Sequence, residues 1–162
     1  MMNDRYEILR QRFSRQKSNT LDYKEELSYA VIKFRDDVKE SLGLADAYCK
    51  ALDMPYVAII GPNGEQWAEM QHIQFEAGKV NFKLILVIEG TEGFSDSCQI
   101  FEFVLVSALS CGIAHFSLDD KREYWTSNTE ELINRILLRL ERALSINPLC
   151  EQLDKVDLEF IR

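Results

Sequence analysis

The stretch "VNFKLILVIEG", which starts at Val80, most constrains the fold of this chain. Successive side chains of a strand point to opposite faces of its sheet. The alternate positions that share one apolar face are Val80, Phe82, Leu84, Leu86 and Ile88. Ile85 and Val87 make the other face partly apolar as well, which predicts a strand inside a sheet rather than at its edge.

A turn signal precedes this strand in "YVAIIGPNGEQW", residues 56–67. Asn63-Gly64 tolerates the positive φ angles of a two-residue turn and predicts a hairpin with arms at 56–60 and 66–76. The letters "IIGPNG" also resemble the start of a phosphate-binding loop. Such a loop needs Gly, Lys and Ser or Thr at positions that Gln66, Trp67 and Ala68 occupy here, so no nucleotide is expected.

Helical periodicity is clearest near the two ends of the chain. We expect a short helix over 4–17, a break at "SNT" (18–20), a stronger helix from Leu21 to Gly43, and one more short helix in "ADAYCKAL". The last predicted helix follows Ser127. Its apolar stripe consists of Leu132, Ile133, Ile136, Leu137, Leu140, Ala143 and Leu144.

Residues 98–110, "CQIFEFVLVSALS", fit two structures. The alternating aromatic residues suit a strand, whereas the apolar residues also share a helical face. The length of the segment favours a buried helix. After it, "IAHFSL" and "REYWT" predict a second hairpin.

These elements predict an α+β fold with a mainly antiparallel sheet of about five strands, in the order helices-βββ-α-ββ-α, flanked by helices. The expected organisation is a basic N-terminal arm over 1–20, a single α+β domain over 21–148, and a C-terminal tail over 149–162.

Charge is unevenly placed along the 162 residues. In the first 20 residues, five basic and two acidic side chains give a charge of +3. Because the whole chain carries −8, the remaining residues carry −11. An acidic body makes nucleic acid an unlikely partner, because affinity for it comes largely from neutralised phosphates.

No apolar run is long enough for a membrane span, and no signal core follows the N-terminus. The cysteines show no C-x-x-C spacing, so we expect reduced thiols in a cytoplasmic protein.

Few residues suggest catalysis or metal binding. Cys111 and His115 are four residues apart without further ligands nearby, and His72 stands alone, so no catalytic, cofactor or metal residue is assigned. The element order also matches restriction-endonuclease-like nucleases. Their acid-x-Lys pair is missing at the relevant strand end, because Thr91 stands where the Lys should be, two residues after Glu89. Literal matches occur at 22–24, 37–39 and 119–121.

Large apolar residues on otherwise polar strands suggest protein binding, because an amphipathic edge strand can accept an extended peptide. The residues proposed for this contact are Trp67, Met70, Phe75, Ile85, Tyr124 and Trp125. The alternative for each of them is packing in the core beneath the helices.

From about 45 to 144 the chain resembles the small acidic chaperones of type III secretion, best in "GIAHFSLDDKREYW" and "NTEELINRILLRLERAL". The resemblance implies a homodimer that binds a non-globular segment of a client protein without ATP. It would place a dimer surface on a helix containing Phe101, Val104, Leu105 and Ala108. The first 44 residues and the tail have no counterpart in that family.

We therefore expect a non-catalytic protein-binding module, a small acidic chaperone or adaptor. Two alternatives stay open. One is a degenerate metal-dependent nuclease, and the other is a toxin-neutralising immunity protein whose acidic face blocks a basic partner.

Overall fold

A computed structural model describes residues 3–44, 47–91, 97–119 and 124–145. The chain forms two compact units, residues 1–129 and residues 130–162. Helices and a five-stranded antiparallel sheet make this an α+β protein, as predicted. The predicted tail, 149–162, lies outside the described residues.

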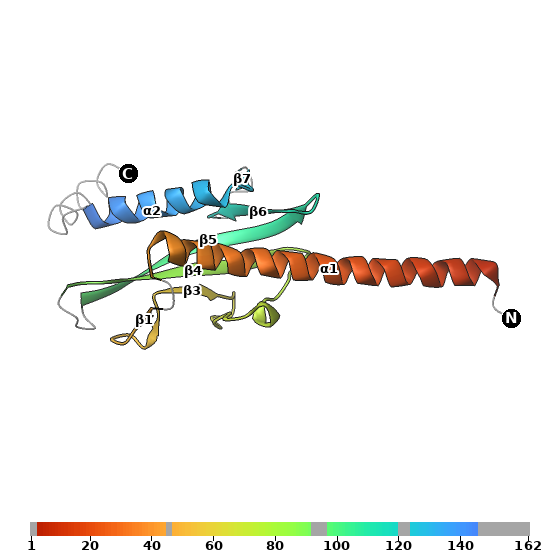
Figure 1. Ribbon diagram of the computed structural model, residues 1–162, viewed down its shortest axis with the longest axis horizontal. Coiled ribbons are helices and arrows are strands. Elements are labelled where there is room, and N and C mark those ends of the chain that lie inside the picture. The colour runs from red at the N-terminus through yellow and green to blue at the C-terminus, as the bar shows by residue number, and fades with distance from the viewer. Residues whose placement is uncertain (1–2, 45–46, 92–96, 120–123, 146–162) are drawn as a thin grey trace, which may run out of the picture. The chain divides into compact units, whose positions relative to one another are not determined.

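Helix α1 runs without interruption over Asp4–Ser41 (Figure 1). The predicted break at 18–20 is wrong, and so the predicted arm boundary at residue 20 falls inside one helix. The hydroxyl of Thr20 donates to the carbonyl of Gln16 at 2.9 Å, a hydrogen bond that a helix accommodates. Asn3 caps the start by accepting from the backbone N–H of Arg5 at 3.1 Å, and Gly43, with φ of 67°, follows the end.

The sheet is a meander in which consecutive strands are neighbours. Its order is β3-β4-β5-β6-β7, and every pairing is antiparallel. The strands are β3 (Val57–Ile60), β4 (Val80–Glu89), β5 (Cys98–Ser110), β6 (Ile113–Leu118) and β7 (Trp125–Thr126). Strand β4 has a partner on each side, as its two apolar faces predicted.

Strand β5 corrects the prediction of a buried helix over 98–110. All ten residues of β4 pair with it, from Val80 opposite Ser107 to Glu89 opposite Cys98. A helix would have left the hydrogen-bonding groups on this side of β4 without their ladder, whereas a strand satisfies them. The alternating aromatic residues were therefore the better signal.

Two further segments differ from prediction. Residues 48–55 form a small ladder of β1 (Tyr48–Cys49) and β2 (Met54–Pro55) instead of a helix. The turn at 61–65 does form, with a hydrogen bond of 2.8 Å from the Gly61 N–H to the Glu65 carbonyl. The segment 66–76, however, then leaves the sheet and contains the short 3₁₀ helix η1 (Met70–His72), so β3 pairs with β4 instead.

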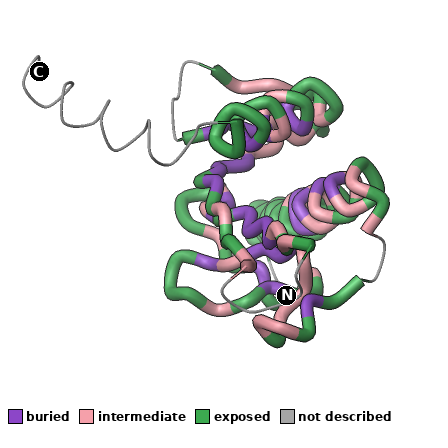
Figure 2. The backbone as a smooth tube through the Cα atoms, turned by 90° about the vertical axis from the view of Figure 1, so that its left-hand side faces the viewer, coloured by how far each residue is buried: buried purple, intermediate pink, exposed green. Residues whose placement is uncertain are grey.

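The core of the first unit lies between α1 and one face of the sheet. Phe34 of α1 contacts the rings of Phe82 and Phe116, with ring centroids 6.4 and 5.1 Å apart. Figure 2 shows buried residues in both the strands and α1. Helix α2 (Thr129–Ser145) begins where predicted and buries four residues, Leu132, Ile133, Ile136 and Leu140. In the described part of the chain, neither helix has the length and apolarity needed to span a membrane.

Candidate functional site

The first half of α1 extends past the ends of the strands (Figure 1). Every residue from 3 to 22 is exposed. Five of these exposed side chains are large and apolar, and they are 49% to 65% exposed: Tyr6, Ile8, Leu9, Phe13 and Leu21. Tyr6, Leu9 and Phe13 are three and four residues apart, so they share one side of the helix, and a contiguous exposed apolar surface marks an interaction site.

The position of Leu9 and Phe13 on the helix explains why they are apolar. With 3.6 residues per turn, they continue the stripe that farther along α1 carries the buried residues Leu27, Val31 and Phe34. The stripe is covered where α1 crosses the sheet and uncovered where α1 has passed it. The helix thus presents an apolar face with no counterpart among the described residues.

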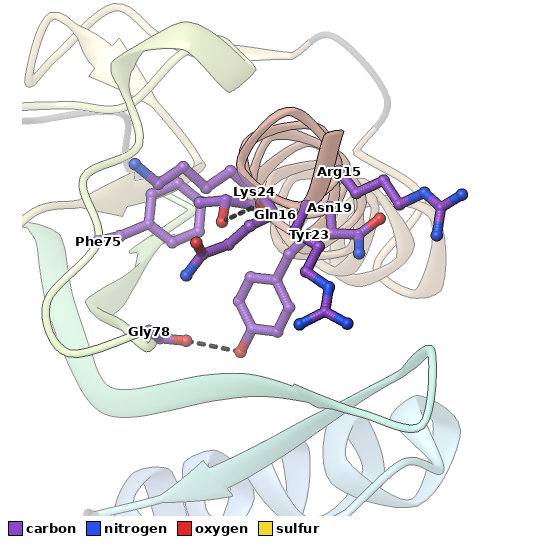
Figure 3. A pocket seen from close by; sticks show the side chains of 9 residues that line it. Arg15, Gln16, Asn19, Tyr23, Lys24, Phe75 and Gly78 are labelled. Atoms are coloured by element: carbon purple, nitrogen blue, oxygen red, sulfur yellow. Dashed lines mark hydrogen bonds between the residues drawn. The ribbon is translucent and has the colours of Figure 1, made fainter. Parts of the chain in front are cut away.

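A groove of about 700 Å³ lies where α1 leaves the sheet (Figure 3). We call it the α1 groove. Its lining residues are Arg12, Arg15, Gln16, Asn19, Thr20, Tyr23, Lys24, Phe75 and Gly78. Among these described residues, three carry positive charge and none is acidic, so the α1 groove is suited to an anionic group.

Tyr23 fixes the floor of the α1 groove. Its hydroxyl donates to the carbonyl of Gly78 at 2.7 Å and accepts from the backbone N–H of Leu109 at 3.2 Å. Gly78 belongs to the tight turn between 76 and 79, where φ is 51° at Ala77 and 76° at Gly78. One side chain therefore joins α1, the turn before β4 and the end of β5.

The groove also has an apolar wall next to its charges. The ammonium of Lys24 lies 5.7 Å from the ring centroid of Phe75, within the range of a cation–π contact. Figure 3 shows the Lys24 side chain next to the Phe75 ring, while Arg15 extends away from it. Beyond the turn, the ammonium of Lys79 lies 5.7 Å from the ring of Trp125. A ligand with both carboxylates and apolar side chains would match these groups.

The charge of α1 reverses beyond the groove. A smaller cavity of about 380 Å³ is lined by Asp22, Glu25 and Glu26 together with Tyr29 and Met70. Basic and acidic surfaces thus lie next to each other along one helix, and only the first of them is suited to an anionic partner.

The six residues predicted to contact a partner do not form one surface. Trp67 and Ile85 are 1% and 4% exposed, so they are core residues and do not present a contact surface. A Cβ at Gly61 would stand 2.6 Å from the Trp67 ring, so the ring packs directly against the turn. The other four residues are partly or fully exposed. They are divided among the α1 groove (Phe75), the acidic cavity (Met70) and the chain at or before β7 (Tyr124 and Trp125).

The predicted dimer surface is also divided. Because β5 is a strand, Phe101 and Leu105 point to one face of the sheet and Val104 and Ala108 to the other. Leu105 is 1% exposed and belongs to the core, whereas Val104 is 45% exposed. A helix would place these four residues on one face, but the strand divides them between the two faces of the sheet.

Glu89, the acidic residue considered for a nuclease site, is exposed at the end of β4. Its carboxylate accepts a hydrogen bond from the hydroxyl of Tyr56, and this bond is the main reason that the pKa of Tyr56 rises to about 12. Two of the acid-x-Lys matches lie in α1. The acid of one of them, Asp37, accepts from the ammonium of Lys33 at 3.1 Å. The third match is only partly described.

Arg12, Arg15, Tyr23 and Lys24 were missed as site residues, although the sequence held a signal for them. Positions 12, 16, 19 and 23 share one helical face, and the segment 1–20 is basic in an acidic chain. Phe75 was among the residues predicted to contact a partner, but its position beside α1 was not readable, because a predicted strand over 66–76 would place it in the sheet.

Comparisons of the chain with protein-family models, with curated proteins and with solved structures found no match.

Proposed function

We propose that this protein is a non-catalytic protein-binding module that holds an acidic, amphipathic segment of a partner protein along the first half of α1. The observation that carries the proposal is the α1 groove, where three cations lie next to an aromatic wall and to an uncovered apolar helix face.

Charge complementarity selects the polar part of the partner. Carboxylates of a bound segment would pair with Arg12, Arg15 and Lys24, and like charges would exclude basic segments. Arg side chains suit this role because the planar guanidinium can bind a carboxylate through two parallel hydrogen bonds.

The uncovered stripe selects the apolar part. An amphipathic helix lays its apolar face on such a surface and contacts it at positions i, i+3, i+4 and i+7. Leu9 and Phe13 supply matching contacts on α1, and Phe75 supplies one on the facing turn. The acidic body of the chain, −11 outside the first 20 residues, favours a protein segment over a nucleic acid, because affinity for a nucleic acid comes largely from neutralised phosphates.

The edges of the sheet are less suited to peptide binding than the sequence implied. On the outer side of β3, the carbonyl of Ile59 already accepts from the N–H of Trp67 at 2.8 Å. At the other edge, β7 has only two residues. Groove binding on α1 therefore replaces strand addition in the proposal.

A chaperone or adaptor role fits this mode of binding. The support for it is the acidic body, the small size and the resemblance to type III secretion chaperones. Homodimerisation belongs to the same proposal and would involve a surface other than Leu105. Sedimentation velocity at several concentrations tests it, since a strict monomer would remove the dimer from the proposal.

Binding is tested with a pair of labelled helical peptides of about 16 residues, long enough for four turns. The first peptide carries Leu and Phe on one face and Glu on the other, and in the second every Glu is Lys. We expect fluorescence anisotropy to rise with the acidic peptide only. A single-stranded oligonucleotide serves as an anion of another class, and tighter binding of it would favour a nucleic-acid partner.

The double variant Arg12→Glu/Arg15→Glu should weaken binding of the acidic peptide by at least about tenfold, since each exposed ion pair contributes up to about 1 kcal/mol and reversal adds repulsion. The matched control is Lys17→Glu, on the same exposed half of α1 but outside the groove lining. An equal loss in the control variant would mean that net charge, not the groove, governs binding.

A further inference from the structure

A cluster of potential metal ligands lies where the hairpin of β4 and β5 has its connecting segment, at the end away from the α1 groove. Glu89 and Cys98 are register partners at the ends of β4 and β5. Directly opposite residues of an antiparallel pair project their side chains to the same face, so the carboxylate and the thiol are neighbours. Cys49, from the short strand β1, joins them.

We infer that Cys49, Glu89 and Cys98 form a binding site for a thiolate-preferring divalent cation such as Zn²⁺. The two sulfur atoms and a carboxylate oxygen all lie within 4.8 Å of one another. Zn–S bonds of about 2.3 Å and Zn–O bonds of about 2.0–2.2 Å reach three such atoms after small side-chain rotations. Two thiolates with one carboxylate favour Zn²⁺ over Mg²⁺ or Ca²⁺, which prefer oxygen ligands.

The surroundings of the carboxylate support this assignment. Tyr56 donates its hydroxyl hydrogen bond to one oxygen of Glu89, Oε2, which leaves Oε1 for a cation. The backbone carbonyl of Tyr56 is itself held by the N–H of Val87 at 2.8 Å. A hydrogen bond from a well-anchored residue to a ligating group orients that ligand, as is usual around protein-bound metals.

Burial is graded across the cluster. Cys49 is fully buried, Cys98 is half-buried and Glu89 is exposed. No fourth Cys, His, Asp or Glu of the described chain joins them. The site would therefore hold the cation by three protein ligands and keep one position on the solvent side for water or for a group of another molecule.

This site is independent of the α1 groove. Its ligands come from segments far apart in sequence, at positions 49, 89 and 98, so no short spacing signals it. A bound cation would also link the β1–β2 ladder to the end of the β4–β5 hairpin. Any cation that binds only the folded chain stabilises it by mass action, and so the melting temperature should rise with added Zn²⁺.

The decisive experiment uses the full chain with Cys111→Ser and Cys150→Ser, in which Cys49 and Cys98 are the only thiols. The reduced protein is titrated with Co²⁺, whose bonds to thiolates give a charge-transfer absorption band. We expect one Co²⁺ per chain, a band that requires thiolate ligands, and its loss when Zn²⁺ is added.

Two variants made in that background separate the contributions of Cys98 and Glu89 to cation binding. Cys98→Ser should abolish the band and weaken binding by more than about 100-fold, beyond the 10–100-fold typical of changes to supporting residues. Glu89→Gln should keep a band but weaken binding at least about tenfold. Glu102→Gln, an exposed carboxylate of β5 outside the cluster, is the matched control and should bind as the parent does. Circular dichroism verifies that each variant is folded.

Three results would overturn the inference. The first is a folded parent protein with two free thiols and no cobalt band. The second is unchanged Co²⁺ binding in Cys98→Ser. The third is a purified parent whose thiols react only after reduction, because a disulfide between Cys49 and Cys98 would then occupy the cluster in place of a cation.

Discussion

At the residue scale, the hydroxyl of Tyr23 carries much of the geometry of the α1 groove. It bonds to the Gly78 carbonyl and to the Leu109 N–H, and these backbone groups come from a turn and a strand that are distant in sequence. The N–H of Leu109 is part-buried and would cost free energy without a partner, whereas the carbonyl of the exposed Gly78 can bond to water, so the hydroxyl affects stability mainly through Leu109.

Replacing Tyr23 by Phe should therefore lower the free energy of unfolding by about 1 kcal/mol, since the part-buried N–H of Leu109 loses its partner. The same substitution at Tyr29, which is 59% exposed on the same helix, should change it by less than about 0.5 kcal/mol. Urea unfolding of both variants measures the difference. Equal effects would show that the Tyr23 hydrogen bonds do not stabilise the fold.

At the element scale, hydrophobic periodicity predicted the correct helix or strand wherever a segment matched only one period. The two apolar faces of β4 and the stripe of α2 were readable because each matches a single period. Residues 98–110 matched both periods, and only the ladder with β4 decides between them. The sequence also did not predict that α1 continues through Ser18–Thr20, because three polar residues in a row usually indicate a helix end. In the structure, the hydroxyl of Thr20 donates to the carbonyl of Gln16, and the helix accommodates this bond.

The strand character of β5 can be tested by neighbouring substitutions. Leu105→Ala should cost about 2–5 kcal/mol of stability, because Leu105 is 1% exposed. Val104→Ala, on the opposite face and 45% exposed, should cost less than about 1 kcal/mol. Chemical denaturation gives both values. Similar losses at the two positions would argue against the alternation of a strand.

The two halves of α1 allow a second comparison within one element. Phe34→Ala removes a fully buried ring and should destabilise the protein by about 3–5 kcal/mol. Phe13→Ala, at a ring 65% exposed on the same stripe, should leave stability within about 0.5 kcal/mol yet weaken binding of the acidic peptide. Denaturation and anisotropy report these effects separately. A large loss of stability at Phe13 would mean that the exposed stripe is already covered.

At the scale of the whole molecule, charge and exposed apolar surface coincide. The first 20 residues carry +3 in a chain of −8, and residues 4–20 belong to the part of α1 that extends past the strands. Composition alone predicted a basic arm, but not that it continues into the next helix without a break or that it lines a groove. The metal-site cluster was beyond prediction for a related reason, since its three ligands meet only through the register of β4 with β5 and the placement of β1.

The central claim is that the cations of the α1 groove select an acidic partner, and an exchange of charges tests it most directly. The affinities of the acidic and the basic peptide are measured for the wild-type chain and for Arg12→Glu/Arg15→Glu. The account predicts that the wild type prefers the acidic peptide and that the variant prefers the basic one, because the sign of the groove has been reversed. A variant that loses the acidic peptide without gaining the basic one, or a wild type that binds both equally, would contradict it.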